Sequence, residues 1–364
     1  MDLHDALLEK LKEIYELLKE GKEVKIRLSS RGFLNIRFDE VKGLIKLGEK
    51  LSEREFFNAA HVRRFVQTIL VASRVIKLLE SGKHASQREM YYQLKHHLPF
   101  SKENTFECEA ETIKAIEDLE RLFRGKAIRE QFHITADRRG ALFGDIVIVD
   151  KSIPGEFAEF VPAKLGRGGW AIPSTIEEIE IKDINADYVL VIESAAMYER
   201  LIEEGFPKKS RAILITTQGQ ASRGVRRLLN RLRYEYNLPI IVFNDCDPWG
   251  FYIYFVLKSG SMNLAYLSEK LAIPDAKYVG MCLEDIKRYR LTNVLEKLKE
   301  VDVKRAKEML RYPWISRFEE WKRELSKMIE LKVRLEQQAL ASKSLEFVAE
   351  KYLPEKIENK IFLP

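Results

Sequence analysis

Three acidic residues follow apolar segments of the chain in a pattern typical of metal-dependent chemistry. The segment YVLVI at residues 188–192 runs directly into Glu193, and PIIVF at residues 239–243 is followed closely by Asp245 and Asp247. If both segments are strands of one parallel sheet, their carboxyl ends meet at one crevice, where such sheets bind ligands. Three carboxylates gathered there repel one another unless a cation lies between them, and Mg²⁺ prefers oxygen ligands. The alternative is that the acids cap the helices that follow.

A helix is expected around two adjacent tyrosines. Ser86 is followed three residues later by Glu89, a capping-box pattern, so the helix should begin at Ser86 and end before Pro99. On such a helix the neighbours Tyr91 and Tyr92 point about 100° apart. Tyr91 shares its face with leucines and is expected in the core, whereas Tyr92 lies on a polar face.

The polar face around Tyr92 is basic, because Arg88, Lys95 and His96 are three or four residues away from it. A phenol has a pKa of about 10 and is a poor nucleophile at neutral pH. Neighbouring cations favour the phenolate, and they can orient a phosphodiester and stabilise the charge that develops on it. The pattern predicts a tyrosine nucleophile that attacks a phosphodiester. The alternative is an amphipathic tyrosine on a solvated helix.

An arginine-rich helix is expected further along the chain. No acid interrupts residues 222–234 (SRGVRRLLNRLRY), and the leucines are spaced to face inward. We expect the arginines, including Arg223, Arg226 and Arg227, to spread over an outer surface suited to a phosphate backbone. The alternative is a solvated face that is balanced by acids from elsewhere.

A basic turn is expected at Arg138 and Arg139, between predicted strands at residues 132–135 and 141–149. Two helices followed by a two-stranded ribbon with a basic tip is the order of a winged helix-turn-helix. From residue 188 onward, short apolar segments alternate with helical ones, which predicts a parallel sheet covered on both faces.

Composition limits the class of protein. The 364 residues are 46% hydrophobic and 32% charged, as in a folded chain of two or three domains. No apolar run approaches the roughly 18 residues of a membrane span, and the first twenty residues lack a signal-peptide pattern. Three scattered cysteines argue against disulfides and thiolate zinc sites and favour a reducing compartment. No G-x-x-x-x-G-K-[ST] loop is present, and a net charge of +6 is weak support for a polyanionic partner.

Taken in order, the motifs resemble those of the A subunits of topoisomerase VI, the archaeal type IIB DNA topoisomerases, which are related to the meiotic double-strand-break transesterase. The family's R-E-x-Y-Y motif matches residues 88–92, and its catalytic tyrosine is the last of them, Tyr92. Its Toprim glutamate matches Glu193, and its D-x-D-P-x-G motif matches residues 245–250. Its G-Q-P…T-R-R segment matches residues 219–227, with Ala and Val in place of the Pro and Thr.

The resemblance implies a multidomain α/β fold in three parts. Residues 1–65 form an N-terminal helical extension with short strands, a candidate contact for the family's B subunit. Residues 66–150 form a winged-helix (CAP-like) DNA-binding domain that carries Tyr92. Residues 151–364 form a Toprim α/β domain with a mainly parallel sheet, the metal site and the C-terminal helices.

The resemblance also implies a function. Tyr92 makes a transient 5′-phosphotyrosyl double-strand break that is resealed after strand passage, so that supercoils are relaxed and DNA is decatenated. Arg88 stabilises the reacting phosphate, and Mg²⁺ is held by Glu193, Asp245 and Asp247. The expected DNA contacts are Lys95, His96, Arg138, Arg139, Arg223, Arg226 and Arg227.

The implied assembly is a homodimer of A subunits within an A2B2 heterotetramer on double-stranded DNA, in the cytoplasm and associated with the nucleoid. The B subunit hydrolyses ATP. Two alternatives remain. One is a break-forming transesterase that works with other partners and does not relax DNA, and the other is a non-catalytic DNA-binding protein whose acids are structural.

Overall fold

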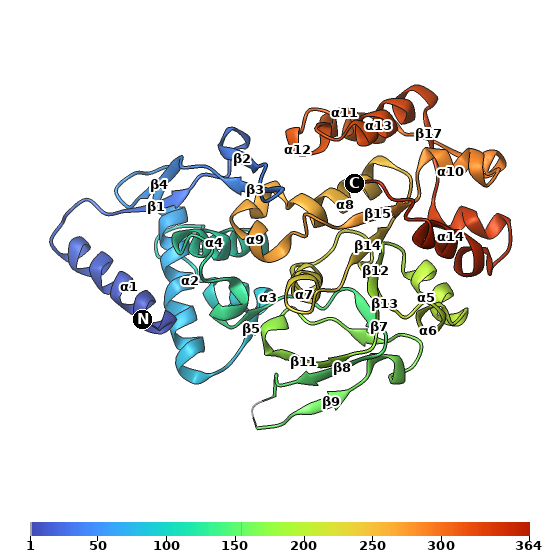
Figure 1. Ribbon diagram of the computed structural model, residues 1–364. Coiled ribbons are helices and arrows are strands. Elements are labelled where there is room, and N and C mark those ends of the chain that lie inside the picture. Colours follow the sequence, from blue (N-terminus) through green and yellow to red (C-terminus); the bar gives the residue numbers. More distant parts are fainter. Residues whose placement is uncertain (1, 154) are drawn as a thin grey trace. The chain divides into compact units, whose positions relative to one another are not determined.

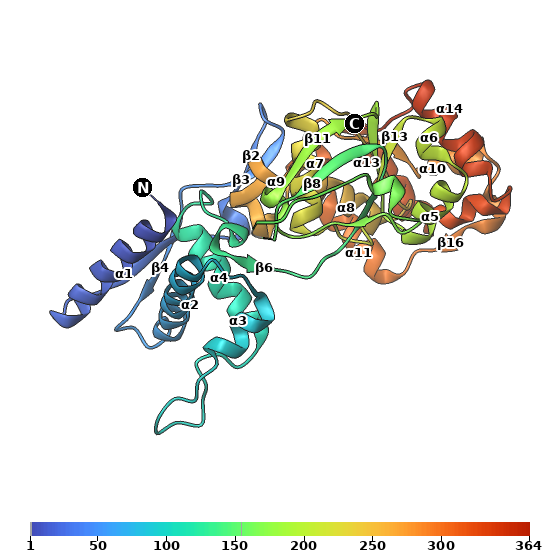
Figure 2. The ribbon, with the colours of Figure 1, turned by 90° about the horizontal axis from the view of Figure 1, so that it is seen from below.

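The computed structural model describes residues 2–153 and 155–364, which divide into two compact units (Figures 1 and 2). The first unit comprises the chain through Arg37 together with Lys46–Asp137, and the second comprises Phe38–Ile45 together with Arg138–Pro364. Among the described residues, no helix is long and apolar enough to span a bilayer.

The first unit is mainly helical. Its helices are α1 (Leu3–Lys19), α2 (Val62–Ser81), α3 (Gln87–Leu94) and α4 (Glu109–Leu122). Its strands form two small sheets, with β1 (Lys25–Ser29) antiparallel to β4 (Leu51–Glu55), and β5 (Ala85–Ser86) parallel to β6 (Ile134–Thr135). A further pair, β2 (Ile36–Asp39) with β3 (Leu44–Leu47), lies where the chain passes between the units.

Helix α1 packs against its own unit. Leu7 and Ile14 are seven residues apart, so they lie on one face of the helix, and both are buried. Leu7 belongs to an apolar cluster with Val71 of α2, and Ile14 belongs to a second cluster with Phe65. One face of α1 is therefore used for packing within its own unit.

The start of α3 is confirmed as a capping box. The Ser86 hydroxyl accepts a hydrogen bond from the Glu89 backbone N–H at 3.1 Å, and the Glu89 carboxylate accepts one from the Ser86 backbone N–H at 2.7 Å. Two of the N–H groups that a helix start leaves unpaired are thus satisfied.

The predicted end of this helix is wrong, because α3 stops at Leu94 and does not continue toward Pro99. The hydroxyl of Thr105 donates to the Leu94 carbonyl at 2.5 Å and accepts from the His96 N–H at 2.8 Å. Pro99 also disfavours helical geometry at Leu98. A side chain from the returning loop therefore replaces the next helical hydrogen bonds.

The second unit is an α/β structure. Its helices are α5 (Ala195–Glu203), α6 (Phe206–Lys209), α7 (Arg223–Tyr234), α8 (Pro248–Ser259), α9 (Ser268–Leu271), α10 (Leu283–Arg288), α11 (Glu300–Met309), α12 (Pro313–Ser316), α13 (Glu319–Leu331) and α14 (Leu353–Glu358). Its strands are β7 (Ala141–Phe143), β8 (Ile146–Asp150), β9 (Ala158–Phe160), β10 (Trp170–Ala171), β11 (Ile179–Ile184), β12 (Tyr188–Ile192), β13 (Ala212–Thr216), β14 (Ile240–Phe243), β15 (Lys277–Gly280), β16 (Glu296–Lys297) and β17 (Val333–Arg334).

The central sheet confirms the predicted parallel arrangement. Its strand order is β10-β7-β13-β12-β14-β15, and the four strands from β13 to β15 are mutually parallel. Every residue of β12, β13 and β14 is buried. Helices α5 and α6 cover one face and α7 and α8 the other (Figure 1). A smaller antiparallel sheet, β11-β8-β9, belongs to the same unit.

The predicted two-stranded ribbon around Arg138 and Arg139 is wrong. Strand β6 pairs with β5 in the first unit, whereas β7 pairs antiparallel with β13 at the edge of the central sheet. Gly140 explains the path of the chain, because it has a φ of 87° and a Cβ there would lie 2.6 Å from the Thr216 carbonyl oxygen. The glycine lets the backbone run directly against β13.

The capping box leads to a stability prediction. Replacing Ser86 by alanine should destabilise α3 by about 0.5–2 kcal/mol, the usual cost of losing such a cap. The exchange of the Glu89 and Met90 amide hydrogens should accelerate roughly 2- to 30-fold, which hydrogen–deuterium exchange of the full chain measures. The matched control is Ser222→Ala, which removes the hydroxyl that caps α7 and should leave exchange in α3 unchanged. Equal protection of α3 in both variants would contradict the conclusion that the Ser86 hydroxyl stabilises this helix.

The same cap has a defined pH dependence. The hydrogen bond from the Ser86 backbone N–H is the main cause that lowers the pKa of Glu89 below 4.5. This stabilisation is therefore present above the unfolded pKa and lost as the pH falls through the lower folded value. Relative to intrinsic exchange rates, α3 of the unaltered protein should accordingly be less protected at pH 3 than at pH 6, and Glu89→Gln should remove most of this difference.

Candidate active site

Two of the three predicted metal ligands lie side by side at the end of the central sheet. Strands β12 and β14 are parallel neighbours in register, with Ile192 opposite Phe243, so Glu193 and Asp245 emerge at the same edge. The Glu193 N–H donates to the Phe243 carbonyl at 3.3 Å, and the Asp245 N–H donates to Glu193 Oε2 at 3.4 Å. Glu193 and Asp245 therefore lie together at the end of the sheet, as the sequence predicted.

Asp247, the third predicted ligand, is the N-cap of α8. Its Oδ1 accepts hydrogen bonds from the backbone N–H groups of Trp249 at 2.9 Å and Gly250 at 2.7 Å. Its Oδ2 lies 3.7 Å from Nη1 of Arg334. Gly250 is required at its position because a Cβ there would collide with the Asp245 carbonyl oxygen. Oδ1 of Asp247 therefore caps the helix, as the capping alternative expected. Oδ2 faces the guanidinium group of Arg334.

The electrostatics of this edge are unfavourable for three negative charges. Burial, followed by the charges of Asp245 and Asp247, raises the pKa of Glu193 to about 8. Burial also raises the pKa of Asp245 to about 7, with Asp247 and Glu336 adding to the effect while a backbone N–H from Gln337 opposes it. The pKa of Asp247 is raised as well, mainly by burial. Desolvation and like charge together make full ionisation costly here without a cation.

The carboxylates at this edge offer oxygen ligands of the kind that Mg²⁺ prefers. Within residues 2–153 and 155–364, no three acidic, histidine or cysteine side chains converge closely enough to form a metal-holding group by themselves. Mg²⁺ does not require such a cage, because it commonly binds one or two carboxylates and keeps several waters. The adjacent carboxylates of Glu193 and Asp245 fit that pattern, and Asp247 offers its second oxygen.

A segment that the sequence did not single out lies against these acids. Leu335 pairs with Cys246 through two backbone hydrogen bonds, of 2.8 and 3.1 Å, and the backbone N–H of Gln337 donates to Oδ1 of Asp245 at 2.8 Å. This segment is about ninety residues further along the chain, where the sequence shows only a charged helical tail. The one local sign of this contact in the sequence is the apolar Leu335 between the charged residues Arg334 and Glu336.

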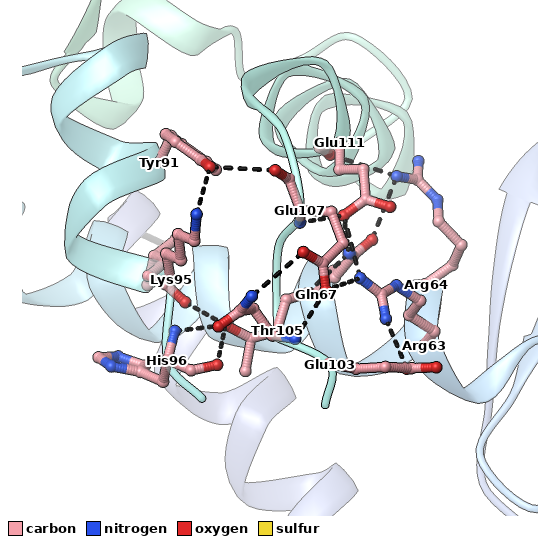
Figure 3. Close-up of polar contacts among 12 residues, drawn as sticks. Arg63, Arg64, Gln67, Tyr91, Lys95, His96, Glu103, Thr105, Glu107 and Glu111 are labelled. Carbon is pink, nitrogen blue, oxygen red and sulfur yellow. Dashed lines mark hydrogen bonds and ion pairs between the residues drawn. The ribbon is translucent and has the colours of Figure 1, made fainter. Parts of the chain in front are cut away.

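Tyr92 is available for chemistry and Tyr91 is not. The Tyr92 side chain is 63% exposed, whereas Tyr91 is partly buried against the first unit's core. The Tyr91 hydroxyl donates to the carbonyl of Glu107 at 3.1 Å (Figure 3). Arg88, four residues before Tyr92, is exposed on the same face.

The expected basic companions of Tyr92 are only partly realised. Nζ of Lys95 donates to the Tyr91 hydroxyl at 3.0 Å and lies 5.3 Å from the centre of the Tyr91 ring, so Lys95 is directed to the other tyrosine (Figure 3). Lys95 follows the last residue of α3, and His96 lies beyond the helix. The prediction that both share a helical face with Tyr92 is therefore wrong, because the helix ends too early.

A polar network anchors the loop that follows α3 (Figure 3). The buried Gln67 amide donates to the Thr105 carbonyl at 2.8 Å and to the Glu111 carboxylate at 3.0 Å. Arg63 forms an ion pair with Glu103 at 3.0 Å and another with Glu111 at 3.4 Å. These contacts hold the loop to α2 and α4, and thereby fix the end of the helix that carries Tyr92.

The arginines of α7 do not form the predicted outer surface. Arg226 is 2% exposed, its Nε and Nη2 have no hydrogen-bond partner among the described residues, and burial lowers its pKa to about 10. Arg227 pairs with Glu177 at 2.6 Å, and Arg231 donates to the Ile176 and Ile179 carbonyls. The alternative, a face balanced by acids from elsewhere, describes Arg227 with Glu177 and Arg233 with Asp275 but not the buried Arg226. Arg223 is partly buried, while Arg138 and Arg139 are exposed.

Comparison with known families covers both units. The family of Toprim domains from the A subunit of topoisomerase 6 and from Spo11 matches residues 188–357, and the family described as "Type IIB DNA topoisomerase" matches residues 63–134. A third family, the all-beta domain in the alpha chain of DNA topoisomerase VI, matches residues 139–185, which contain β7 to β11. The three matches follow one another along the chain.

Relatives match over nearly the full length. The A subunit of the type 2 DNA topoisomerase 6 from Pyrococcus abyssi is 54% identical over 97% of this chain and 93% of its own length. Proteins of the same description from Hyperthermus butylicus and Methanothermobacter thermautotrophicus are 38% and 34% identical over 96% and 98% of the chain, and over 93% and 99% of their own lengths. The chain therefore belongs to the family of topoisomerase VI A subunits, the DNA-cleaving subunits of type IIB DNA topoisomerases.

Proposed function

We propose that Tyr92 is the nucleophile that cleaves DNA. The observation that carries this proposal is an exposed tyrosine on a helix that is fixed at both ends, beside an exposed Arg88, in a chain of this family. The Tyr92 hydroxyl loses its proton and its oxygen attacks a backbone phosphorus, forming a 5′-phosphotyrosyl bond. The 3′ oxygen leaves and takes up a proton. The reverse reaction reseals the strand with no net loss of phosphodiester bonds.

We further propose that Arg88 stabilises the negative charge on the reacting phosphate, since an arginine can donate two parallel hydrogen bonds to phosphate oxygens. Glu193, Asp245 and Asp247 would hold Mg²⁺, which when bound supplies positive charge that stabilises phosphate oxygens. The closeness of Glu193 to Asp245 and the raised pKa values of all three carboxyls support this role, because a cation relieves their repulsion.

The proposed partners are double-stranded DNA and the ATP-hydrolysing B subunit. We propose a homodimer within an A2B2 heterotetramer, in which the tyrosine of one protomer works with the metal site of its partner, in the cytoplasm at the nucleoid. Helices α2, α3 and α4 would supply the helical core of a winged-helix DNA-binding domain. The free face of α1, which carries the exposed Tyr15, remains the candidate B-subunit contact.

The nucleophile leads to a direct test. Tyr92→Phe should reduce covalent protein–DNA complexes to background, because the phenol oxygen forms the bond. The assay is trapping with denaturant in the presence of Mg²⁺ and the B subunit. Tyr91→Phe is the matched control, since it removes a neighbouring hydroxyl that is engaged with Glu107 and should retain covalent complexes. Complexes that persist in Tyr92→Phe would assign the nucleophile to another residue.

The acid residues lead to a test that does not need DNA. Glu193→Gln should raise the melting temperature of the protein in EDTA by a few degrees at pH 9, above the Glu193 pKa of about 8, because it removes a half-buried negative charge beside Asp245. The same variant should lose most of the melting-temperature increase that Mg²⁺ gives the unaltered protein. Glu199→Gln, an exposed acid on α5, is the control and should change neither quantity. An unchanged Mg²⁺ response in Glu193→Gln would rule out this residue as a ligand.

The corrected arginine positions lead to a DNA-binding test. We propose that Arg138 and Arg139 contact phosphates, together with Arg223, Lys95 and His96, while Arg227 holds α7 to Glu177 and Arg226 is buried away from DNA. The double variant Arg138→Ala/Arg139→Ala should then reduce the slope of log affinity against log salt by about 1.8, or roughly 0.9 for each phosphate contact.

The control for that measurement is Arg227→Ala, which breaks the ion pair with Glu177 and should leave the salt slope unchanged. Fluorescence anisotropy with a duplex oligonucleotide at several salt concentrations gives both slopes. Equal slopes in the double variant and the unaltered protein would remove Arg138 and Arg139 from the DNA surface.

A further inference from the structure

Residues 334–338, which we name the brace, run beside the loop that carries two of the acids. Arg334 lies 3.7 Å from the Asp247 carboxylate, and Leu335 and Cys246 exchange backbone hydrogen bonds of 2.8 and 3.1 Å. The brace therefore follows the acid-bearing loop residue by residue in the antiparallel direction.

Gln337 is the member of the brace that reaches both acid-bearing strands. It is fully buried, its Nε2 donates to the Phe243 carbonyl at 2.6 Å, and its backbone N–H donates to the Asp245 carboxylate at 2.8 Å. Its Oε1 accepts from the Ser194 N–H at 3.4 Å. One side chain thus ties the residue that follows Glu193 to the end of β14, two residues before Asp245.

The chemistry of an amide suits this position. The site must fix a backbone carbonyl and a backbone N–H at once, and a glutamine side chain carries both a donor and an acceptor. It does so without adding charge to an edge where three carboxylates already raise one another's energy. A carboxylate at position 337 would repel the Phe243 carbonyl, and an apolar side chain would leave that buried carbonyl without this donor.

We propose that Gln337 is a positioning residue of the metal site, which sets the separation of the Glu193 and Asp245 carboxylates before a cation binds. This inference rests on the proposed function that those acids hold Mg²⁺. Residues that orient metal ligands without touching the metal typically change metal affinity about 10- to 100-fold when replaced. A purely structural glutamine would instead change the stability of the unit and leave the affinity of the folded protein alone.

The test measures Mn²⁺ affinity of the full chain by electron paramagnetic resonance, in the absence of DNA, together with the melting temperature in EDTA. Gln337→Met keeps the length of the side chain, removes its two side-chain hydrogen bonds and retains the backbone N–H that faces Asp245. It should weaken Mn²⁺ binding about 10- to 100-fold. Gln337→Asn keeps the buried amide but shortens its reach, and it should weaken binding in the same direction. Gln337→Asn also provides the affinity measurement if Gln337→Met does not fold.

The matched control is Asn230→Leu, which removes a buried amide from the same unit. The Asn230 side chain donates to the Ala272 carbonyl at 2.8 Å, on α7 and away from the acids. This variant should lower the melting temperature and leave the Mn²⁺ dissociation constant within about twofold of the original. A loss of affinity in Asn230→Leu equal to that in Gln337→Met would overturn the proposal, since general destabilisation would then explain both.

Asp245→Asn separates failure of the inference from failure of the proposed function. If Asp245→Asn weakens Mn²⁺ binding while both Gln337 variants bind as the unaltered protein does, the acids hold the metal and the positioning role of Gln337 is wrong. If Asp245→Asn binds Mn²⁺ normally, the metal site itself is wrongly assigned, and the inference falls with it.

Discussion

The second unit is organised around carboxylates that repel one another. Glu193 and Asp245 are brought together by the parallel register of β12 and β14, and burial makes their shared charge more costly than it would be in water. Such an arrangement persists only if the backbone that carries it cannot move apart. The fully buried strands supply that rigidity along the sheet, and the brace supplies it at the end where the strands give way to loops.

In the first unit, the short helix α3 must be held in place while its side chain Tyr92 stays exposed. Helix α3 has eight residues, too few for a helix to be stable by itself in water. Its first turn is held by the Ser86 capping box and its last by the hydroxyl of Thr105, while the Tyr91 hydroxyl ties its middle to the Glu107 carbonyl. Tyr92 makes none of these contacts. Its neighbours fix the helix so that Tyr92 itself remains exposed to solvent.

What the sequence could predict follows from the range of the interactions involved. The apolar strands of the central sheet and the capping box depend on local patterns, and each was predictable. The pairing of Glu193 with Asp245 spans 52 residues, but it follows from the geometry of parallel strands once those segments are recognised. The end of α3 was not, because Thr105 acts from eleven residues beyond it in the returning loop. Gln337 was not, because its partners are about 94 and 143 residues away along the chain. No spacing in the sequence marks such a contact.

The arginines of α7 show why an arginine-rich sequence does not by itself identify a DNA-binding surface. A guanidinium presents several donors in one plane, which suits a phosphate and suits a pair of backbone carbonyls equally well. Arg231 uses that geometry on the carbonyls of Ile176 and Ile179, and Arg227 uses it on Glu177. Only the acceptors that the folded chain itself supplies decide between the two uses. The arginine-rich pattern of residues 222–234 therefore overstates what this helix can offer to DNA, since several of its guanidinium groups are already engaged in holding the fold together.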